Sequence, residues 1–536
     1  MSSAPHRRLT GRSHANNPPV AIDRRSRRGL PINRPAPGLG IRPRRPHAQE
    51  PAIATLHHPR TSTPRPTGTP PGTTPHRVTV LLPAALSLAL GLWGVRRGGA
   101  LWRDEAVTYD MAHRELPQLW ATLGNADAVH GLYYLLTHAL FRLTGDADPV
   151  LVMRLPSVLA AAVACGLLAL LGLRLAGPRA GLAAGLVLAL LPQTQRYAQE
   201  GRSYTLVCAL VIGATYVLLR AVESDTRRVW TGYATLMLLA CLLHEFAVLA
   251  LPAHALALPA RHRRTWLWAA LPVCALLAPL ALLSVGQSEQ VGWIGGIKAG
   301  AVAGFAGMSA AGLACAMWLR RQHPETTRPL IPLPRLALPL LTLPPAILLL
   351  TSLAKPLYVD RYVLYANAGG ALLLGAVLGR ARPRVLLAAG AAVLALLPYS
   401  LHLRTPESRL DDLSAIGQTL RAAGQDADGI VYLPGRRRVW TLADPSSVAT
   451  LQDLALAESP SASHTLYGTE TDPDTIRARM VATPRILAVT DPPDQPQDQT
   501  PTEHIKRTTL ATSFERCAEW DLRGARVELY AHRGKC

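Results

Sequence analysis

The chain has 536 residues, of which 49% are hydrophobic and 17% are charged, and its formal net charge is +21. Apolar runs fill residues 78–403 and exclude a wholly soluble protein, whereas polar segments precede and follow them. Much of the positive excess lies beside the first apolar run, which favours retention against anionic lipid over nucleic-acid binding.

Residues 1–77 contain fourteen arginines against two acids, many prolines and almost no periodic apolar pattern. A segment of this composition cannot bury enough apolar surface to fold. No apolar stretch with a small-residue cleavage site precedes Val78, so we expect this tail to stay on the protein. We therefore predict a disordered basic tail on the cytoplasmic side.

Eleven apolar runs follow, and most are long enough to cross a hydrocarbon core of about 30 Å. We expect spans at about 78–95, 150–173, 180–195, 203–219, 229–243, 246–260, 266–284, 299–319, 336–353, 362–379 and 385–403. Residues 129–143 form a short segment interrupted by His and Arg, which suits an amphipathic helix in the outer interface better than a crossing.

The distribution of arginine supports this topology. The loops that become cytoplasmic contain fifteen arginines: Arg174, Arg179, Arg220, Arg227, Arg228, Arg261, Arg263, Arg264, Arg320, Arg321, Arg328, Arg335, Arg380, Arg382 and Arg384. The loops on the other side are acidic or mixed, as the positive-inside rule predicts, although Arg96 and Arg97 go against it. We therefore expect a multi-pass protein of the cell membrane with its polar span ends on the external face.

The stretch LWRDEAVTYD, residues 101–110, follows the first span and places Arg103, Asp104 and Glu105 side by side. A carboxylate fixed just outside a membrane span is in a partly dehydrated place where it can act as a base. Two ordinary solvated charges at a helix start are the alternative interpretation.

Further polar clusters fall at the external ends of other spans: His130 with Tyr133 and Tyr134; Arg196, Tyr197, Glu200 and Arg202 in RYAQEGRSY; His244 and Glu245; and Tyr358, Asp360, Arg361 and Tyr362 in YVDRY. Each could be a membrane anchor, a charged turn or an interfacial aromatic belt. Together, their arginines and carboxylates fit the binding of an anionic head group, such as a lipid phosphate, next to a base. His244-Glu245 lacks the second histidine of a zinc motif, and no Walker A or G-x-G-x-x-G sequence offers a nucleotide cradle.

The order of these motifs resembles a known group of enzymes. An external acidic pair, HGLYYLL, RLPS at 154–157, RYAQEGRSY and a late arginine–tyrosine segment look like GT-C glycosyltransferases, in particular the protein O-mannosyltransferase and aminoarabinose-transferase group. The resemblance covers about residues 80–400. Two departures are His130-Gly131-Leu132 where the family commonly has His-Pro-Pro, and Asp360 in place of a proline.

This resemblance implies an inverting enzyme that moves a sugar, mannose or another hexose or pentose, from a polyprenyl-phosphate carrier to an external protein, glycan or lipid acceptor. By analogy Asp104 is the general base, and Glu105 orients it or contacts the sugar. The remaining cluster residues and Arg103 would bind the donor and its phosphate. Arginines can stabilise the leaving phosphate without a metal, so no cofactor is expected, although a divalent cation stays open.

After residue 403 the pattern changes to that of a small external α/β domain. Helices are expected at 414–423 and 475–482, strands at 429–434, 485–490 and 526–532, and a polar proline-rich loop at 491–503. An oxidising location would let Cys517 and Cys536 form a disulfide, with two free thiols as the alternative. Acceptor recognition and shielding of the site are both possible roles for this domain.

Two other functions compete with a transferase. A transporter or flippase of a lipid-linked sugar could use the same external charges, and a non-catalytic scaffold could present the C-terminal domain to a partner. Transporters often show repeated halves and broken helices at mid-membrane. Here no internal repeat is found and the polar residues gather at one end of the spans, which favours a one-sided enzyme.

Overall fold

A computed structural model describes residues 74–145, 147–287, 294–322, 330–493 and 495–536. Every described element belongs to one compact unit. The predicted disordered tail falls almost wholly outside the described residues, and the two predicted domain boundaries, after residues 77 and 403, stay predictions.

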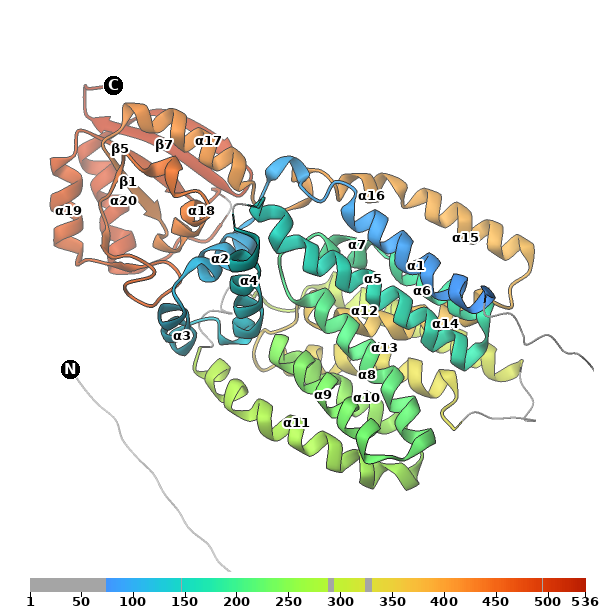
Figure 1. Cartoon of the computed structure of the whole chain (residues 1–536). Coiled ribbons are helices and arrows are strands. Elements are labelled where there is room, and N and C mark those ends of the chain that lie inside the picture. The colour runs from blue at the N-terminus through green and yellow to red at the C-terminus, as the bar shows by residue number, and fades with distance from the viewer. Residues whose placement is uncertain (1–73, 146, 288–293, 323–329, 494) are drawn as a thin grey trace, which may run out of the picture. The chain divides into compact units, whose positions relative to one another are not determined.

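Each predicted apolar run contains a helix (Figure 1). These helices are α1 (Thr74–Leu92), α5 (Pro149–Ala176), α6 (Pro178–Leu190), α8 (Tyr204–Ser224), α9 (Arg227–Leu243), α10 (Ala250–Ala257), α11 (Ala260–Gly286), α12 (Ala299–Arg321), α13 (Leu333–Thr351), α14 (Asn367–Leu378), and α15 (Pro383–Ala395) followed by α16 (Leu397–His402). Within the described residues, seven helical segments are long and apolar enough to cross a membrane. The predicted helical membrane fold is confirmed, whereas the count of eleven crossings stays a prediction because α1, α6, α9 and α10 are not among these seven segments.

Small residues let the central helices approach closely. On α14, a Cβ added to Gly375 would meet the backbone nitrogen of Ala184 on α6 at 2.4 Å. A Cβ added to Gly172 on α5 would meet the Cα of Gly181 on α6 at 2.8 Å. Helix pairs in membranes commonly pack in this way. Lipid tails are as apolar as the side chains, so close van der Waals contact between the helices has to hold them together. The three helices thus form the rigid centre of the bundle.

Short helices interrupt the bundle at one end. They are α2 (Arg103–His113), α3 (Leu116–Asn125), η2 (Ala128–His130), α4 (Gly131–Thr144), α7 (Pro192–Ala198), η3 (Glu245–Leu249) and η5 (Asp360–Ala366). The predicted interfacial segment at 129–143 becomes η2 and α4. These irregular joins hold most of the polar clusters singled out in the sequence.

The C-terminal region is an α/β domain, as predicted. Its helices are α17 (Leu413–Ala423), α18 (Val439–Leu442), α19 (Pro473–Ala482) and α20 (Pro501–Ser513), and its strands are β1 (Gly429–Leu433), β2 (Gln452–Asp453), β3 (Leu456–Glu458), β4 (Thr469–Glu470), β5 (Arg485–Thr490), β6 (Phe514–Leu522) and β7 (Ala525–His532). One sheet has the order β2-β1-β5-β7-β6, parallel from β2 to β5 and antiparallel from β5 to β6, and β3 pairs with β4 in a separate hairpin. The predicted loop at 491–503 is wrong at its end, since Pro501 already starts α20.

Side chains alternate between the two faces of this sheet. Val431 and Ile486 pack with Ile476 of α19 in one core cluster. Ile430 and Leu487 belong to the other cluster, on the side of α17. This alternation follows from the period of two in a strand. A disulfide joins Cys517 on β6 to the terminal Cys536.

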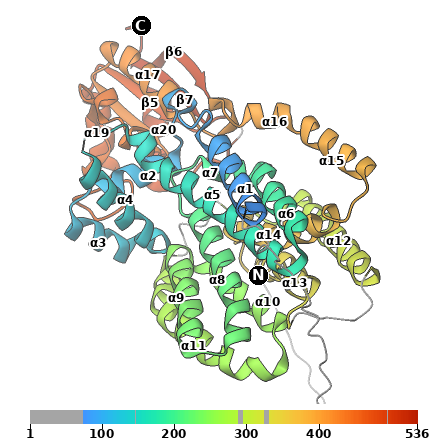
Figure 2. The same cartoon turned by 45° about the vertical axis from the view of Figure 1, so that its right-hand side comes forward.

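The C-terminal domain contacts the short helices directly. Arg114, at the end of α2, donates from Nη2 to the carbonyl of Thr465 at 2.9 Å, and Asn125 of α3 donates to the carbonyl of His464 at 3.2 Å. Both carbonyls belong to the connection between β3 and β4. Figures 1 and 2 show α2 beside this domain in both views. The domain therefore covers the helix that contains Asp104.

Candidate active site

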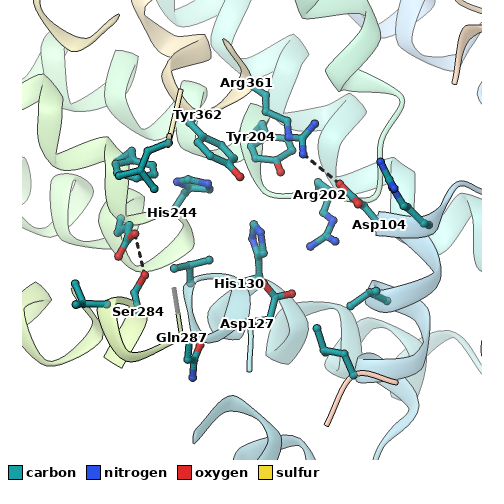
Figure 3. A pocket seen from close by; sticks show the side chains of 18 of the residues that line it. Asp104, Asp127, His130, Arg202, Tyr204, His244, Ser284, Gln287, Arg361 and Tyr362 are labelled. Atoms are coloured by element: carbon teal, nitrogen blue, oxygen red, sulfur yellow. Dashed lines mark hydrogen bonds and ion pairs between the residues drawn. The ribbon is translucent and has the colours of Figure 1, made fainter. Parts of the chain in front are cut away.

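A cavity of about 520 Å³ lies where the helix ends meet the C-terminal domain (Figure 3). Its walls come from α2, η2, the start of α8, η3, α11, η5 and the segment around α18. Eight of the predicted site residues line it: Arg103, Asp104, His130, Arg202, His244, Glu245, Arg361 and Tyr362. The polar clusters that are scattered along the sequence thus meet in one place.

Asp104 and Glu105 lie in the first turn of α2, where carboxylates interact favourably with the helix dipole. Successive residues of an α-helix point about 100° apart around the axis, so Asp104 and Glu105 point in different directions. Asp104 faces the cavity and is partly exposed, and its Oδ2 lies 3.4 Å from Nη2 of Arg361. Arg361 also lies over the rings of Tyr204 and Tyr362, 5.6 and 5.7 Å from their centres.

Glu105 points the other way, into the protein. Its side chain is fully buried, and Arg154 of α5 holds both carboxylate oxygens at 2.7 and 2.6 Å. The backbone N–H of Gly201 donates to Oε1 at 2.9 Å, and Arg97 lies 3.5 Å from Oε2. Although burial opposes ionisation, Arg154, Arg97 and the Gly201 hydrogen bond lower the pKa of Glu105 to about 2. Glu105 does not line the cavity, so in this arrangement it does not reach a sugar bound there. The position of Glu105 suits orienting α2 instead.

Arg202 enters the cavity from the RYAQEGRSY segment. Its Nη1 donates to the hydroxyl of Tyr134 at 3.1 Å, and that hydroxyl donates to Asp127. Nε of Arg202 makes no hydrogen bond to any described residue although the side chain is buried. A buried guanidinium with a spare donor is equipped to bind an anion.

Two imidazoles lie beside each other in the lining of the same cavity. The rings of His130 and His244 are 5.6 Å apart, and His244 lies 4.5 Å from the ring of Tyr362. Nδ1 of each histidine lacks a hydrogen-bond partner among the described residues. Burial lowers the pKa of His130 well below its ordinary value, so this imidazole is neutral near pH 7.

Apolar side chains form the opposite wall. Leu277, Ala281 and Val285 of α11 lie one helical turn apart along it, and Leu249 of η3 adds to them. Glu245 lies at the edge of this wall, where it accepts a hydrogen bond from Ser284 at 3.0 Å. The cavity is therefore cationic on one side and apolar on the other.

The other predicted donor-binding residues lie outside the cavity lining: Tyr133, Tyr134, Arg196, Tyr197, Glu200, Tyr358 and Asp360. Tyr133 is fully buried and donates to the carbonyl of Met153, and Tyr197 donates to Asp360 at 3.0 Å. Arg196 lies 3.7 Å from buried Glu200, which also pairs with Arg409 at 3.2 Å. These hydrogen bonds and ion pairs lie behind the wall and link its segments.

The C-terminal domain supplies lining residues that the sequence analysis missed. They are Leu410, Arg436, Arg437, Val439, Leu466 and Tyr467. The run of three arginines at 436–438, directly after a predicted strand, is the one signal in the sequence that could have indicated them. Asp127 and Tyr204 were also missed, because neither stands out from its neighbours.

Arg103 joins this domain to the site. Its Nε lies 3.5 Å from Oδ2 of Asp411, a buried carboxylate just before α17. Burial raises the pKa of Asp411, and Arg103 and Arg437 oppose that rise. Among the described residues, no group of three or more His, Cys, Asp or Glu side chains is placed to hold a metal ion.

Comparisons with known proteins give a solved structure and a family. Among solved structures, the chain is similar to the crystal structure of ArnT from Cupriavidus metallidurans in the apo state, with 13% identity, a TM-score of 0.42, and coverage of 84% of this chain and 97% of that chain. No curated protein matches the chain. Residues 132–309 match the family described as dolichyl-phosphate-mannose-protein mannosyltransferase, a range that includes Arg202 and His244 but neither Asp104 nor Arg361. Over these residues the family expected from the order of the sequence motifs is confirmed.

Proposed function

We propose that this protein is a membrane glycosyltransferase that transfers a sugar from a polyprenyl-phosphate donor to an acceptor outside the cytoplasmic membrane, with Asp104 as general base. The family match of residues 132–309 and the membrane-spanning helices support this class of enzyme. Mannose is the first sugar to test, because the matching family is named for a mannosyl donor. Another hexose or a pentose remains within the proposal.

One observation supports the proposal most strongly: a carboxylate, two arginines and an apolar wall surround the same cavity. Asp104 lies 3.4 Å from Arg361, and Arg202 enters from a separate segment. A lipid phosphate needs cations for its head group and apolar surface for the start of its chain. The α11 wall and the two guanidinium groups offer both.

The reaction proposed is a single displacement. The acceptor hydroxyl attacks the anomeric carbon, its proton passes to a carboxylate oxygen of Asp104, and the bond from the anomeric carbon to the phosphate oxygen breaks. The phosphate leaves with the bonding electrons, and the configuration at the anomeric carbon inverts. Arg202 and Arg361 would stabilise the negative charge that grows on the leaving phosphate.

The two histidines suit contacts with sugar hydroxyls. His130 and His244 are buried in the cavity wall, and each has a ring nitrogen without a hydrogen-bond partner among the described residues. A neutral imidazole both donates and accepts, which matches the two roles of a hydroxyl group. No metal is part of this proposal, because the arginines supply the positive charge.

A reconstitution experiment separates this function from a transporter of the same lipid. Purified protein in liposomes is given polyprenyl-phosphate mannose, and separately the arabinose counterpart, with the label on the sugar. A transferase releases label from the lipid by breaking the sugar–phosphate bond, whether acceptor or water receives it. Labelled lipid that crosses the bilayer with its sugar–phosphate bond intact would contradict the proposal.

A further inference from the structure

A second cavity of about 230 Å³ lies wholly within the C-terminal domain. It is formed where the chain leaves β1, where the β3–β4 connection ends and where α20 begins. Arg436 and Tyr467 line both this cavity and the larger one that contains Asp104. The two cavities are therefore neighbours that share a wall.

Glu503, in the first turn of α20, is the buried polar residue that best defines the second cavity. Its side chain is buried, and Oε1 accepts hydrogen bonds from the backbone of Gly435 at 2.8 Å and from Lys506 at 2.6 Å. Oε2 makes no hydrogen bond to any described residue, and the closest approach of Arg507 to it is 4.0 Å. A buried carboxylate oxygen without a donor is costly unless a ligand or water donates to it.

The charges around this cavity balance one another. Arg438 pairs with Asp453 at 2.6 Å and with Glu470 at 3.0 Å, and Lys506 also reaches Glu470 at 3.0 Å. Arg436 pairs with Asp498. The lining thus presents fixed donors and acceptors without a strong excess of either sign. Such a surface fits a neutral ligand with many hydroxyl groups better than an anion or a cation.

Gly435 lets the side chains of Glu470 and Arg438 approach its backbone closely. A Cβ added there would meet Oε1 of Glu470 at 2.4 Å and Nη1 of Arg438 at 3.0 Å. The ring of Tyr467 adds the apolar surface on which the C–H face of a sugar can lie. The second cavity thus combines a small volume, balanced polar groups and one aromatic ring.

We infer that the second cavity binds a neutral sugar residue of the acceptor, beside the hydroxyl that is presented to Asp104. This inference rests on the proposed function and adds to it that the acceptor is a saccharide. Oε2 of Glu503 accepts a hydrogen bond from a sugar hydroxyl. Arg436 and Tyr467, which line both cavities, contact the acceptor where it extends from one cavity into the other.

Direct binding without donor tests this inference. Full-length protein in nanodiscs is titrated with methyl glycosides of mannose, glucose, galactose and arabinose and with a threonine-containing peptide, and binding is followed by saturation-transfer NMR. Loss of a hydrogen bond to a buried charge should weaken saccharide binding about 10- to 100-fold in Glu503→Gln. Arg436→Gln, which changes a partly exposed side chain, should act in the same direction without endangering the fold.

Glu528→Gln is the matched control, because this buried carboxylate of the same domain pairs with Arg516 at 2.8 Å and lines neither cavity. It should bind the glycosides as the wild type does. Binding that is unchanged in Glu503→Gln and Arg436→Gln but lost in Asp104→Asn would assign the probe to the first cavity and overturn the inference. Binding of the peptide alone would also overturn it. Donor cleavage, measured in the same samples, reports on the proposed function separately.

Discussion

The individual residues of the site have two kinds of role: some face the cavity, and others support the elements around it. Asp104 and Arg361 face the cavity as an ion pair, whereas Glu105 ties α2 to α5 through Arg154. Both oxygens of the Glu105 carboxylate already accept hydrogen bonds, so in this arrangement the group has no free lone pair for a substrate. The division predicts that the two acidic neighbours fail in different ways when they are changed.

Glu105→Gln should lower the free energy of unfolding by about 3–5 kcal/mol, since it leaves Arg154 buried without its counter-charge. Because the folded pKa of Glu105, about 2, lies below its ordinary value of 4.5, the stabilisation is present above pH 4.5 and is lost as the pH falls towards 2. Thermal unfolding in detergent across this range checks both points. The exposed control Glu458→Gln should match the wild type, and a Glu105→Gln protein as stable as the wild type near pH 7 would refute the structural role.

Arg361→Gln should raise the donor KM about 10- to 100-fold, because a charge-assisted contact to the phosphate is lost. Arg361→Lys should recover only part of this, since lysine cannot stack its charge on Tyr204 and Tyr362 as a planar guanidinium does. Steady-state kinetics with labelled donor measure the effect. Arg196→Gln is the comparison, since its side chain lies outside the cavity lining. An equal rise in KM for Arg196→Gln would mean that the phosphate binds elsewhere.

Helices and strands show which features a sequence pattern can predict. Long apolar runs predicted the helices, and short runs of apolar and β-branched residues predicted β1, β5 and β7, which are mostly buried. The whole of α20 was missed since the preceding Asp491–Gln499 is polar and rich in proline, although Thr500 caps the helix and accepts from the N–H of Glu503 at 3.4 Å. The cavity contribution of Tyr467 could not be read from local patterns, because it depends on how the C-terminal domain packs on α2.

The close packing of α6 and α14 gives a prediction at this scale. Gly375→Ala should destabilise the bundle by about 1–3 kcal/mol, because the new methyl group meets the backbone of Ala184. Gly390→Ala is the matched control: it also lies inside a helix, and nothing lies within 4 Å of the added Cβ. Thermal unfolding in detergent distinguishes them. Equal stability of the two variants would contradict the proposed packing.

For the molecule as a whole, the proposed function depends on which membrane face holds the cavity. The arginine-rich loops predict that Arg228 is cytoplasmic, and the cavity and C-terminal domain are then external. The centre of the bundle is packed closely through small residues and leaves no space for a site. The site therefore lies at one end of the spans, between the irregular segments and the domain that covers them. Donor and acceptor would then meet at the membrane surface.

Cysteine accessibility tests this orientation. The exposed residues Glu407 and Arg228 are replaced by cysteine, one at a time, in a chain whose five free cysteines have been changed to alanine. A membrane-impermeant maleimide should label Glu407→Cys in intact cells and Arg228→Cys only after permeabilisation. The reverse pattern would place the cavity on the cytoplasmic side.

The most direct measurement is the single-turnover rate of sugar transfer by Asp104→Asn with the donor that the wild type uses. Loss of a positioned base should lower this rate about 10²- to 10⁴-fold, while donor binding stays within a few-fold of the wild type. Asp110→Asn, on the same helix but outside the cavity lining, should retain the wild-type rate. Transfer by Asp104→Asn at the wild-type rate would contradict the central claim that this carboxylate takes the acceptor proton.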